Sequence, residues 1–209
     1  MKNRIDIIWV RHGATPGNLK RRYIGSTDEP ILPEEEERLA GIREKMLQES
    51  PFPCEHLDAV WSSPLIRCRQ TAAILFPGQD ILIDDDLREC DFGIFENRNF
   101  QELDGDADYQ RWVDSGCTLP IPGGESMGIQ TKRSCEALDR IIADCIVQGK
   151  NTIALAVHGG TIMSIFSVMA DQKKEYYEWH VGNGEGYYTW IDGSRFAEGE
   201  KVLHVDGRF

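Results

Sequence analysis

The stretch with the clearest chemical potential is Arg11-His12-Gly13, which follows an apolar run at residues 5–10. A short apolar run rich in β-branched residues predicts a buried strand, and ligands of open α/β sheets sit beyond the carboxyl ends of the strands. An arginine there can hold a phosphate through paired hydrogen bonds, and a neutral histidine can attack phosphorus. Taken alone, the triplet is a weak signal, because surface arginines and strand-end histidines are common.

A second histidine and a second arginine have comparable positions. His158-Gly159-Gly160 follows a continuous apolar run at 152–157, which is typical of a central parallel strand. A strand at 58–62 is followed by Ser63-Pro64, which we expect to cap and open a helix with Arg67 in its first turn. A helix N-terminus with an arginine is suited to binding phosphate. Together these positions are harder to explain as purely structural than each one alone.

Three acids, Glu89, Asp91 and Glu96, stand among apolar residues. A carboxyl group in an apolar pocket has a raised pKa, which suits a general acid. The residues themselves do not rank the three candidates.

These side chains need an α/β framework to bring them together. Strands are predicted at 5–10, 58–62, 81–83 and 152–157, and strands at 187–191 and 202–205 close the sheet, antiparallel at its edge. Helices are predicted from residue 33 through Met46, at 64–75, 125–148 and 161–170, with a short one at 173–180.

Polar segments connect these elements. Residues 14–18 read as a loop after the first strand, and residues 20–30 read as a long loop over the mouth of the site. The basic cluster at 20–22 could attract a phosphorylated substrate, although a solvated loop is the simpler interpretation for each of these residues. The acidic run at 34–37 predicts a solvated helix start. Residues 99–113 look helical, and we expect a mobile, exposed insertion there.

Composition limits the class of protein. The chain has 209 residues, and we interpret 1–209 as a single domain with a variable insertion at 97–119 over the site. No apolar run reaches membrane-spanning length and no signal peptide is recognisable, so a cytoplasmic location is expected. A net charge of −12 disfavours nucleic acid and anionic membranes as partners. Six scattered cysteines predict free thiols, with no metal-binding spacing. A homodimer is compatible with the sequence, but no pattern specifies its interface.

In combination and in this order, the motifs resemble those of the histidine phosphatase superfamily, the phosphoglycerate-mutase-like fold. The resemblance runs almost the full length and depends on Arg11-His12-Gly13 with Asn18, Tyr23-Ile24-Gly25 with Asp28, Ser62-Ser63-Pro64-Leu65-Ile66-Arg67 with Gln70-Thr71-Ala72, Leu87-Arg88-Glu89, Phe92-Gly93, Pro122-Gly123-Gly124-Glu125-Ser126 and Val157-His158-Gly159-Gly160. It implies a three-layer α/β/α sandwich with a mostly parallel central sheet and an antiparallel edge strand.

The resemblance also implies roles for individual residues. His12 would be the phosphorylated nucleophile, with Arg11, Arg67 and His158 completing the phosphate pocket and Glu89 donating the proton. Contacts to the substrate are expected from Asn18, Thr15, Gly25 and Gly159. Two arginines and a second histidine can neutralise the phosphoryl oxygens, so neither a metal nor a cofactor is expected.

Within the superfamily, the sequence favours hydrolysis over a mutase reaction. Similar mutases are usually longer, and this chain is shorter between Glu89 and Pro122. The resemblance is to the phosphatase branch that includes α-ribazole phosphatase and broad-specificity phosphatases, whose substrates are small phosphorylated metabolites: α-ribazole phosphate, phosphoglycerates or sugar phosphates. The alternatives are a phosphoglycerate-mutase-type phosphotransferase and, in another class, a non-catalytic module that binds a phosphorylated ligand.

Two local features qualify this prediction. Asn97 stands where such phosphatases usually carry glycine, and the turn survives only if asparagine adopts the left-handed conformation. Cys68 and Cys90 adjoin Arg67 and Glu89, which raises the question of redox sensitivity, although buried structural thiols are the simpler interpretation.

Overall fold

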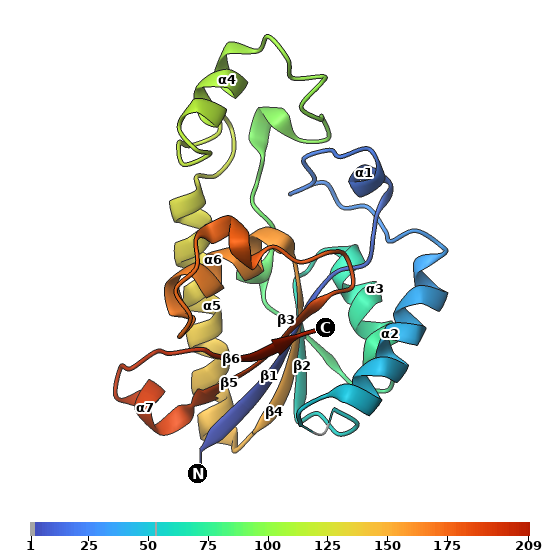
Figure 1. Ribbon diagram of the computed structural model, residues 1–209, viewed down its shortest axis with the longest axis vertical. Helices are drawn as coiled ribbons and strands as arrows, with labels where there is room; N and C mark the ends of the chain where they lie inside the picture. Colours follow the sequence, from blue (N-terminus) through green and yellow to red (C-terminus); the bar gives the residue numbers. More distant parts are fainter. Residues whose placement is uncertain (1–2, 53) are drawn as a thin grey trace.

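A six-stranded sheet in the order β3-β2-β4-β1-β5-β6 forms the centre of the molecule (Figure 1). The structure is a computed structural model that describes residues 3–52 and 54–209. The strands are β1 (Arg4–Arg11), β2 (Ala59–Ser62), β3 (Ile81–Ile83), β4 (Thr152–Val157), β5 (Gly186–Asp192) and β6 (His204–Arg208). The first four are mutually parallel, whereas β5 runs antiparallel to β1 and β6 antiparallel to β5. The predicted mostly parallel sheet with an antiparallel edge is therefore confirmed.

Helices cover both faces of this sheet. The α-helices are α1 (Pro16–Leu19), α2 (Glu35–Glu49), α3 (Ile66–Leu75), α4 (Ala107–Asp114), α5 (Met127–Gln148), α6 (Gly159–Met169) and α7 (Gly193–Ala197), and three 3-10 turns are η1 (Asp85–Leu87), η2 (Gly93–Phe95) and η3 (Tyr176–Trp179). In Figure 1, α2 and α3 lie on one side of the sheet and α5, α6 and α7 on the other. The three-layer α/β/α arrangement is confirmed.

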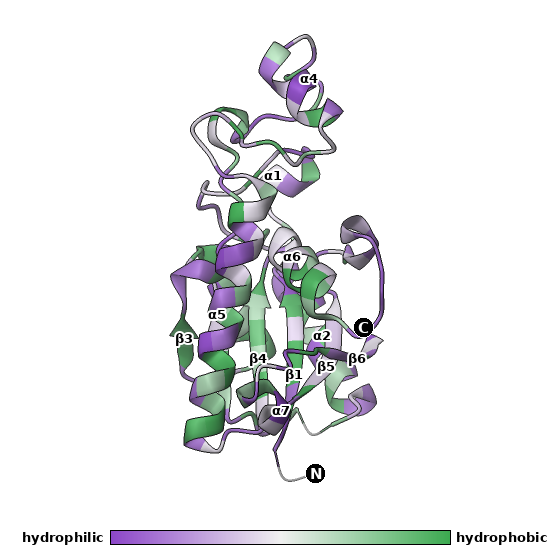
Figure 2. Cartoon of the chain, turned by 90° about the vertical axis from the view of Figure 1, so that its left-hand side faces the viewer, coloured by the Kyte–Doolittle hydropathy of each residue, from purple (hydrophilic) through white to green (hydrophobic). Residues whose placement is uncertain are grey.

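The two cores follow from the alternation of side chains along the strands. Ile7 and Trp9 of β1 pack into the core beneath α5 and α6, whereas Ile8 and Val10 pack into the core beneath α2 and α3. In Figure 2 the strands and the inner faces of the helices are hydrophobic, and α5 turns a hydrophilic face outward. Burial on both faces explains why β1 and β4 read as continuous apolar runs.

The strand register brings three strand ends together. Arg11 at the end of β1 pairs with Val157 of β4, and Ser62 at the end of β2 pairs with Ala156. The residues that follow these strands therefore start from one edge of the sheet.

None of the described helices is long and apolar enough to cross a membrane.

A separate apolar cluster lies above this edge. Phe95, Leu103, Trp112 and Ile121 are buried together, and Tyr23 packs against them from the N-terminal loop. Figure 1 shows the segment with α4 rising beyond the carboxyl ends of the strands. The expectation of an exposed insertion is therefore wrong for Leu103 and Trp112, because this cluster covers them.

Several predicted boundaries differ from the structure. The 99–113 segment is helical only in α4, whereas a short helix, α1, begins in the predicted loop after β1 because Thr15 caps it. Helix α5 begins at Met127, capped by Ser126, rather than at residue 125. The predicted helix at 173–180 is the single turn η3, and the last strand runs over His204–Arg208 rather than 202–205.

Two predictions about polar residues are also wrong. Ser63 does not cap the third helix, because α3 begins at Ile66 with Leu65 at its N-cap and no side-chain cap. The acidic run at 34–37 is not fully solvated, because Glu35 is only 5% exposed. The Glu35 carboxylate accepts a hydrogen bond from Ala14 N at 2.7 Å and pairs with Arg38 at 2.6 Å, which ties α2 to the loop after β1.

Candidate active site

His12 lies buried at the end of β1, and its backbone N–H donates to Val157 O of β4 at 3.0 Å. Its Nδ1 lies 2.8 Å from Gly13 O, and a carbonyl only accepts, so Nδ1 carries the proton and Nε2 keeps its lone pair. Burial, followed by the charges of Arg67 and Arg11, holds the pKa of His12 well below its usual value of 6.5. The ring is therefore neutral and nucleophilic through Nε2.

His158 stands beside His12, with the two ring centroids 5.2 Å apart. Arg67 Nε donates to His158 Nδ1 at 3.3 Å, which leaves the proton on Nε2, 2.7 Å from Ser63 Oγ. Burial, followed by the charge of Arg67, also holds the pKa of His158 well below 6.5. Ser63 thus orients a histidine instead of capping a helix.

Arg67 is fully buried, and most of its donors are engaged by protein groups. Besides His158, its guanidinium donates to Thr27 O at 2.8 Å, Gly25 O at 2.9 Å and Ile24 O at 3.3 Å. Arg67 therefore fixes the 24–27 loop over the site while its charge stays next to the two histidines. At most one of its five N–H groups is left for a ligand.

In contrast to Arg67, Arg11 engages only part of its guanidinium with protein groups. Its Nη1 donates to Val181 O at 2.8 Å and contacts His180 Nε2 at 3.2 Å. Its Nε is buried and has no hydrogen-bond partner in the described part of the chain. Such an unpaired buried donor is costly unless a ligand completes it. It lies next to the place where a Gly159 Cβ would stand, 3.5 Å away, at the N-terminus of α6.

Glu89 projects toward the same helix N-terminus. Its carboxylate accepts from Gly160 N at 3.0 Å, from Gln130 Nε2 at 2.8 Å and from Cys90 N at 2.9 Å. A Cβ on Gly160 would lie 2.1 Å from Glu89 Oε1, so a glycine is needed for this approach. Of the three candidate acids, Glu89 is the one that lines a cavity together with Arg11.

The other two acids have structural partners. Glu96 accepts hydrogen bonds from Gly25 N at 3.0 Å and Ser26 N at 2.8 Å, and Asp91 accepts from Gly93 N at 2.9 Å. Asn97 adopts φ +56°, so the left-handed turn survives with asparagine in place of glycine.

A buried ion pair supports the backbone around Glu89. Arg133 on α5 makes two hydrogen bonds to Glu125, at 2.6 and 2.8 Å. The same guanidinium donates to the carbonyls of Asp86, Arg88 and Glu89 at 2.8–2.9 Å. Arg133 and Glu125, here called the Arg133 clamp, therefore hold the chain segment that carries the predicted proton donor.

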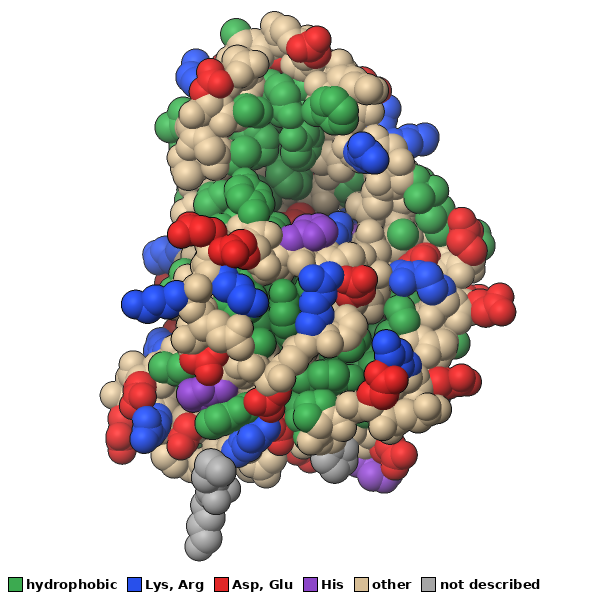
Figure 3. Space-filling view, viewed as in Figure 1, with side chains coloured by type: hydrophobic (Ala, Val, Ile, Leu, Met, Phe, Trp, Pro, Cys, Tyr) green, Lys and Arg blue, Asp and Glu red, His purple; other side chains and the backbone are tan. Residues whose placement is uncertain are grey.

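A cavity of about 390 Å³ opens beside Arg11, Glu89, Gly159 and Gly160. The space-filling view in Figure 3 shows a hollow near the top of the molecule, with hydrophobic side chains on its walls and charged and histidine side chains at its lower rim. Its volume is in the range of small-molecule sites. The cavity therefore adjoins the side chains of Arg11 and Glu89 and the N-terminus of α6.

The predicted substrate contacts occupy different positions. Gly159 lies at the cavity. Thr15 is fully buried and caps α1, and Asn18 Oδ1 accepts from Thr15 N at 3.2 Å and Asn183 Nδ2 at 3.0 Å, so the Asn18 amide N–H is what it can offer a ligand. Gly25 holds its loop close, since a Cβ there would lie 1.8 Å from Cys90 O.

The basic cluster and the cysteines have structural surroundings. Arg22 contacts Glu102 at 2.5 Å and the backbone of Asn97, away from the cavity lining. Cys68 is fully buried against His158, and burial raises the pKa of the Cys68 and Cys90 thiols. Both thiols stay protonated, which makes them poor nucleophiles. Across residues 3–52 and 54–209, no group of three or more His, Cys, Asp or Glu side chains is arranged to hold a metal ion.

Several contributors to the site were missed from the sequence. Gln130 donates a hydrogen bond to Glu89, and Ser63 contacts His158. Asn183 donates to the backbone carbonyl of His12, and His180 contacts Arg11. Gln130 and Arg133 share one face of α5 with the buried residue Ala137. The available signal was three polar residues, Gln130, Arg133 and Ser134, on a helix whose other buried residues are apolar.

Comparisons with known proteins point to one family. Residues 7–200 match the histidine phosphatase superfamily (branch 1). A probable phosphoglycerate mutase GpmB from Enterobacter sp. is 32% identical over 160 residues, which are 75% of this chain and 70% of that protein. The protein of the same name from Salmonella choleraesuis is 31% identical over the same shares.

Solved structures show the same fold. A putative alpha-ribazole-5'-P phosphatase from Escherichia coli superposes with a TM-score of 0.78 at 20% identity, over 96% of this chain and 94% of that one. A phosphoglycerate mutase from Bacillus anthracis gives 0.77 at 19% identity, over 99% and 93%. A mycobacterial glucosyl-3-phosphoglycerate phosphatase gives 0.74 at 21% identity, over 98% and 97%.

Proposed function

The chain belongs to the histidine phosphatase superfamily, branch 1, and on this premise we propose that it is a phosphomonoester hydrolase that acts through a phosphohistidine on His12. The observation that carries the proposal is the state of His12, whose Nδ1 is committed to Gly13 O and whose Nε2 is unprotonated. This nucleophile lies among Arg11, Arg67 and His158, with Glu89 across the adjoining cavity.

In the first step, His12 Nε2 forms a bond to phosphorus while the bond from phosphorus to the ester oxygen breaks. Glu89 gives its proton to the departing oxygen, so the alcohol leaves neutral. In the second step, a water oxygen attacks the phosphohistidine, Glu89 takes the proton of that water, and the N–P bond breaks to release inorganic phosphate. Enzyme, His12 and Glu89 then return to their starting states.

Charge stabilisation in this scheme comes from the protein. Phosphoryl transfer depends on in-line positioning and on neutralisation of the equatorial oxygens. The unpaired Arg11 Nε, the charge of Arg67 and the N-terminus of α6 at Gly159 converge on this place. We therefore propose that turnover requires no metal ion.

The proposed substrate is a small phosphorylated metabolite, with α-ribazole phosphate, a phosphoglycerate and a sugar phosphate as candidates. Solved proteins of this fold include ones described as a putative alpha-ribazole-5'-P phosphatase and a glucosyl-3-phosphoglycerate phosphatase. The cavity beside Glu89 would receive the alcohol portion of the ester.

A second candidate function is a mutase reaction, which the probable phosphoglycerate mutases at 31–32% identity favour. In that case the phosphohistidine would return its phosphoryl group to another hydroxyl of the product. Hydrolysis is favoured because the cavity beside the site is open at the surface, as Figure 3 shows, which gives water access to a phosphohistidine.

The test is phosphate release by the purified chain in EDTA from p-nitrophenyl phosphate, 3-phosphoglycerate, a sugar phosphate and α-ribazole phosphate. We expect release that disappears in His12→Ala, together with an acid-labile phosphoryl group on the wild-type protein. Release that requires added metal would contradict the metal-free mechanism. No release, but isomerisation of phosphoglycerate after priming with a bisphosphoglycerate, would establish the mutase. Binding without either reaction would identify a non-catalytic module.

A further inference from the structure

The wall of the cavity beyond Arg11 and Glu89 is apolar and largely aromatic. Tyr23, Phe92, Trp112, Met163, Tyr176 and Tyr177 contribute to it. These residues come from the N-terminal loop, the segment with α4, helix α6 and the turn η3. Burying apolar area of a ligand against such a wall is favourable, whereas a charged group there loses its hydration without compensation.

Few charged side chains line the cavity, and Glu125 among them already has protein partners. Glu125 also lines it, and although burial alone raises the pKa of Glu125, the hydrogen bonds from Arg133 and Asp91 N outweigh this effect and lower the pKa. Glu125 therefore stays ionised within the Arg133 clamp. Apart from Arg11, no lysine or arginine lines the cavity in the described part of the chain.

His180, at the same cavity, does not supply a positive charge. Burial and the charges of Arg11 and Arg208 lower its pKa, and its Nε2 lies 3.2 Å from the donor Arg11 Nη1. A second anionic group on a substrate would therefore find no cationic partner here and would face the carboxylate of Glu125.

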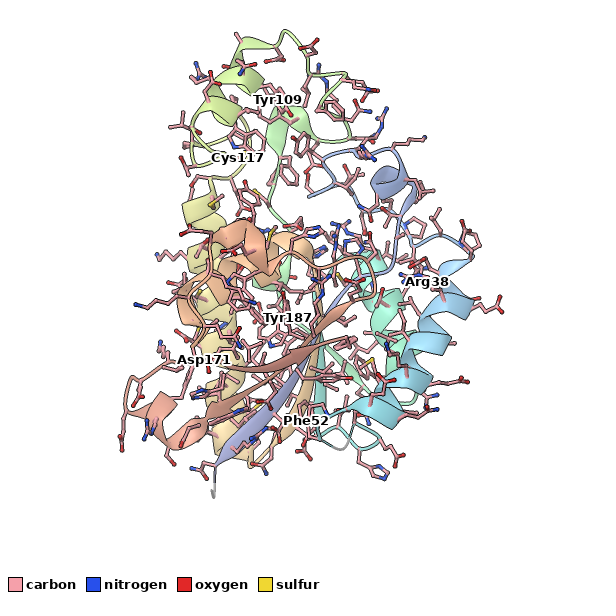
Figure 4. All side chains as sticks on the ribbon, viewed as in Figure 1. Arg38, Phe52, Tyr109, Cys117, Asp171 and Tyr187 are labelled. Carbon is pink, nitrogen blue, oxygen red and sulfur yellow. The ribbon has the colours of Figure 1, made fainter. Side chains whose placement is uncertain are left out.

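Contacts within the protein hold the aromatic wall together. Tyr23 and Tyr109 join their hydroxyl oxygens at 2.8 Å, and the Tyr23 ring meets Trp112 edge-on with centroids 5.6 Å apart. Tyr109 and Cys117 lie in the upper segment beyond the sheet in Figure 4. A preformed wall of rings favours a flat, rigid ligand, because little ordering is required on binding.

From these observations we infer that the substrate is a phosphomonoester whose alcohol portion is uncharged and carries an aromatic ring system, and that phosphoglycerates and other esters with a second anion are excluded. The inference rests on the proposed phosphatase function and names the substrate class of that same site. Arg11 is used by the transferred phosphoryl group, and the apolar wall receives the ring.

The experiment compares three esters of primary alcohols, because similar leaving groups isolate recognition from chemistry. These are 2-phenylethyl phosphate, glycerol 3-phosphate and 3-phosphoglycerate. We expect kcat/KM for 2-phenylethyl phosphate to exceed that for glycerol 3-phosphate by about 30-fold, the order that burial of a phenyl-sized group supports. The value for 3-phosphoglycerate should be the lowest of the three.

A matched pair of variants tests the missing cation directly. Tyr177 lines the cavity and is 56% exposed, so a replacement does not open the core. Tyr177→Arg should lower the preference for 2-phenylethyl phosphate over 3-phosphoglycerate by about tenfold, because a charge-assisted hydrogen bond becomes available to the carboxylate. Tyr177→Phe keeps the ring and should keep the wild-type preference.

The outcomes separate the two proposals. If all three esters are hydrolysed and 3-phosphoglycerate is as good a substrate as 2-phenylethyl phosphate, the inferred class is wrong and the phosphatase function stands. If none is hydrolysed, p-nitrophenyl phosphate is inert as well and His12 takes up no phosphoryl group, the proposed function fails and the inference fails with it.

Discussion

At the scale of single residues, the two central histidines differ in how their ring nitrogens are used. His12 commits only Nδ1, to the carbonyl of Gly13, whereas His158 has Arg67 Nε at one nitrogen and Ser63 Oγ at the other. His12 can therefore bond to phosphorus without giving up a hydrogen bond, and His158 is held as a neutral neighbour. The same residue type at two adjacent strand ends is prepared for two different tasks.

The role of Glu89 is tested by the leaving group of the substrate. Glu89→Gln keeps the shape of the side chain but removes the transferable proton. For an alkyl phosphate we expect kcat to fall about 1000-fold, within the range of general acid catalysis, because the alkoxide must leave unprotonated. For p-nitrophenyl phosphate the loss in the first step should be small, which burst kinetics would measure. An equal loss for both esters would contradict the assignment.

The sequence indicated which residues come together at the strand ends but not their partners. Arg11, His12, Arg67 and His158 follow directly from strand ends, because parallel strands deliver whatever comes next to one edge. Gln130 and Asn183 reach the site from segments far along the chain, and no local pattern shows that contact. Which acid acts was also unresolved locally, and only the position of Glu89 against α6 separates it from Asp91 and Glu96.

At the scale of elements, the N-terminus of α6 serves two neighbours at once. Gly159 lies beside Arg11, whereas Gly160 donates its N–H to Glu89. The close approach of the Glu89 carboxylate to this helix end is possible because Gly160 carries no side chain. Its amide groups also attract an anion.

Gly160→Ala tests this approach. The new Cβ would lie 2.1 Å from Glu89 Oε1 and 2.6 Å from Gln130 Nε2. Because those atoms end flexible side chains, the expected result is displacement of Glu89 rather than unfolding. We expect kcat for an alkyl phosphate to fall about 100-fold with little change in Tm. Gly128→Ala is the matched control, since its Cβ meets only Ser126 Oγ at 3.9 Å. A folded, fully active Gly160→Ala protein would show that this approach is not needed.

The Arg133 clamp gives a stability prediction. Arg133→Ala removes the contacts to three backbone carbonyls and leaves the largely buried Glu125 with only Arg88, at 3.3 Å, as a cationic partner. We expect the free energy of unfolding to fall by about 3–5 kcal/mol, as for other broken buried pairs. Chemical denaturation measures this change.

The neighbouring Lys132 provides the control for that measurement. Its side chain is 76% exposed and it pairs with Glu136 at 3.7 Å, so Lys132→Ala should change stability by less than about 1 kcal/mol. Comparable losses in both variants would mean that the clamp contributes no more than a surface pair.

Errors in the predicted elements share one physical origin. Ser63 and Glu35 are residue types that local rules place at the start of a helix. Both side chains instead form hydrogen bonds with residues from other parts of the chain. Local rules for capping and charge describe an isolated helix, and a buried histidine or an unpaired backbone N–H outweighs them. The short helix α1 was not predicted, because four residues are too few to show a periodic pattern.

At the scale of the whole molecule, the strongly apolar strands made the sheet predictable, whereas the upper segment was not. Its cluster joins Tyr23 to residues as distant as Ile121, and such contacts leave no periodic signal between 97 and 119. Aromatic residues spaced irregularly there, including Tyr109 and Trp112, were the available indication that the segment is packed.

The buried histidines give a pH dependence of global stability. Because the folded-state pKa values of His12 and His158 are depressed below 6.5, the unfolded chain binds more protons below that pH. The neutral folded forms are fully favoured above about pH 6.5, and stability falls as the pH decreases, by about 1.4 kcal/mol per unit for each histidine. Urea unfolding between pH 5 and 7.5 measures this slope.

His12→Gln isolates one contribution to that slope. The variant should have a pH dependence shallower by about 1.4 kcal/mol per pH unit below pH 6, because one titrating group is removed. An identical slope in wild type and variant would contradict a neutral His12 in the folded state.

The division between sheet edge and upper segment has a consequence for protein engineering. The proposed phosphoryl chemistry uses residues at or after the ends of β1, β2 and β4, whereas Phe92 and Trp112 of the aromatic wall come from one continuous stretch between Phe92 and Ile121. Grafting another sequence into that stretch would change which alcohol portions the proposed site accepts, while the residues at the strand ends are retained. The fold therefore offers one segment whose sequence can be replaced to alter substrate selectivity.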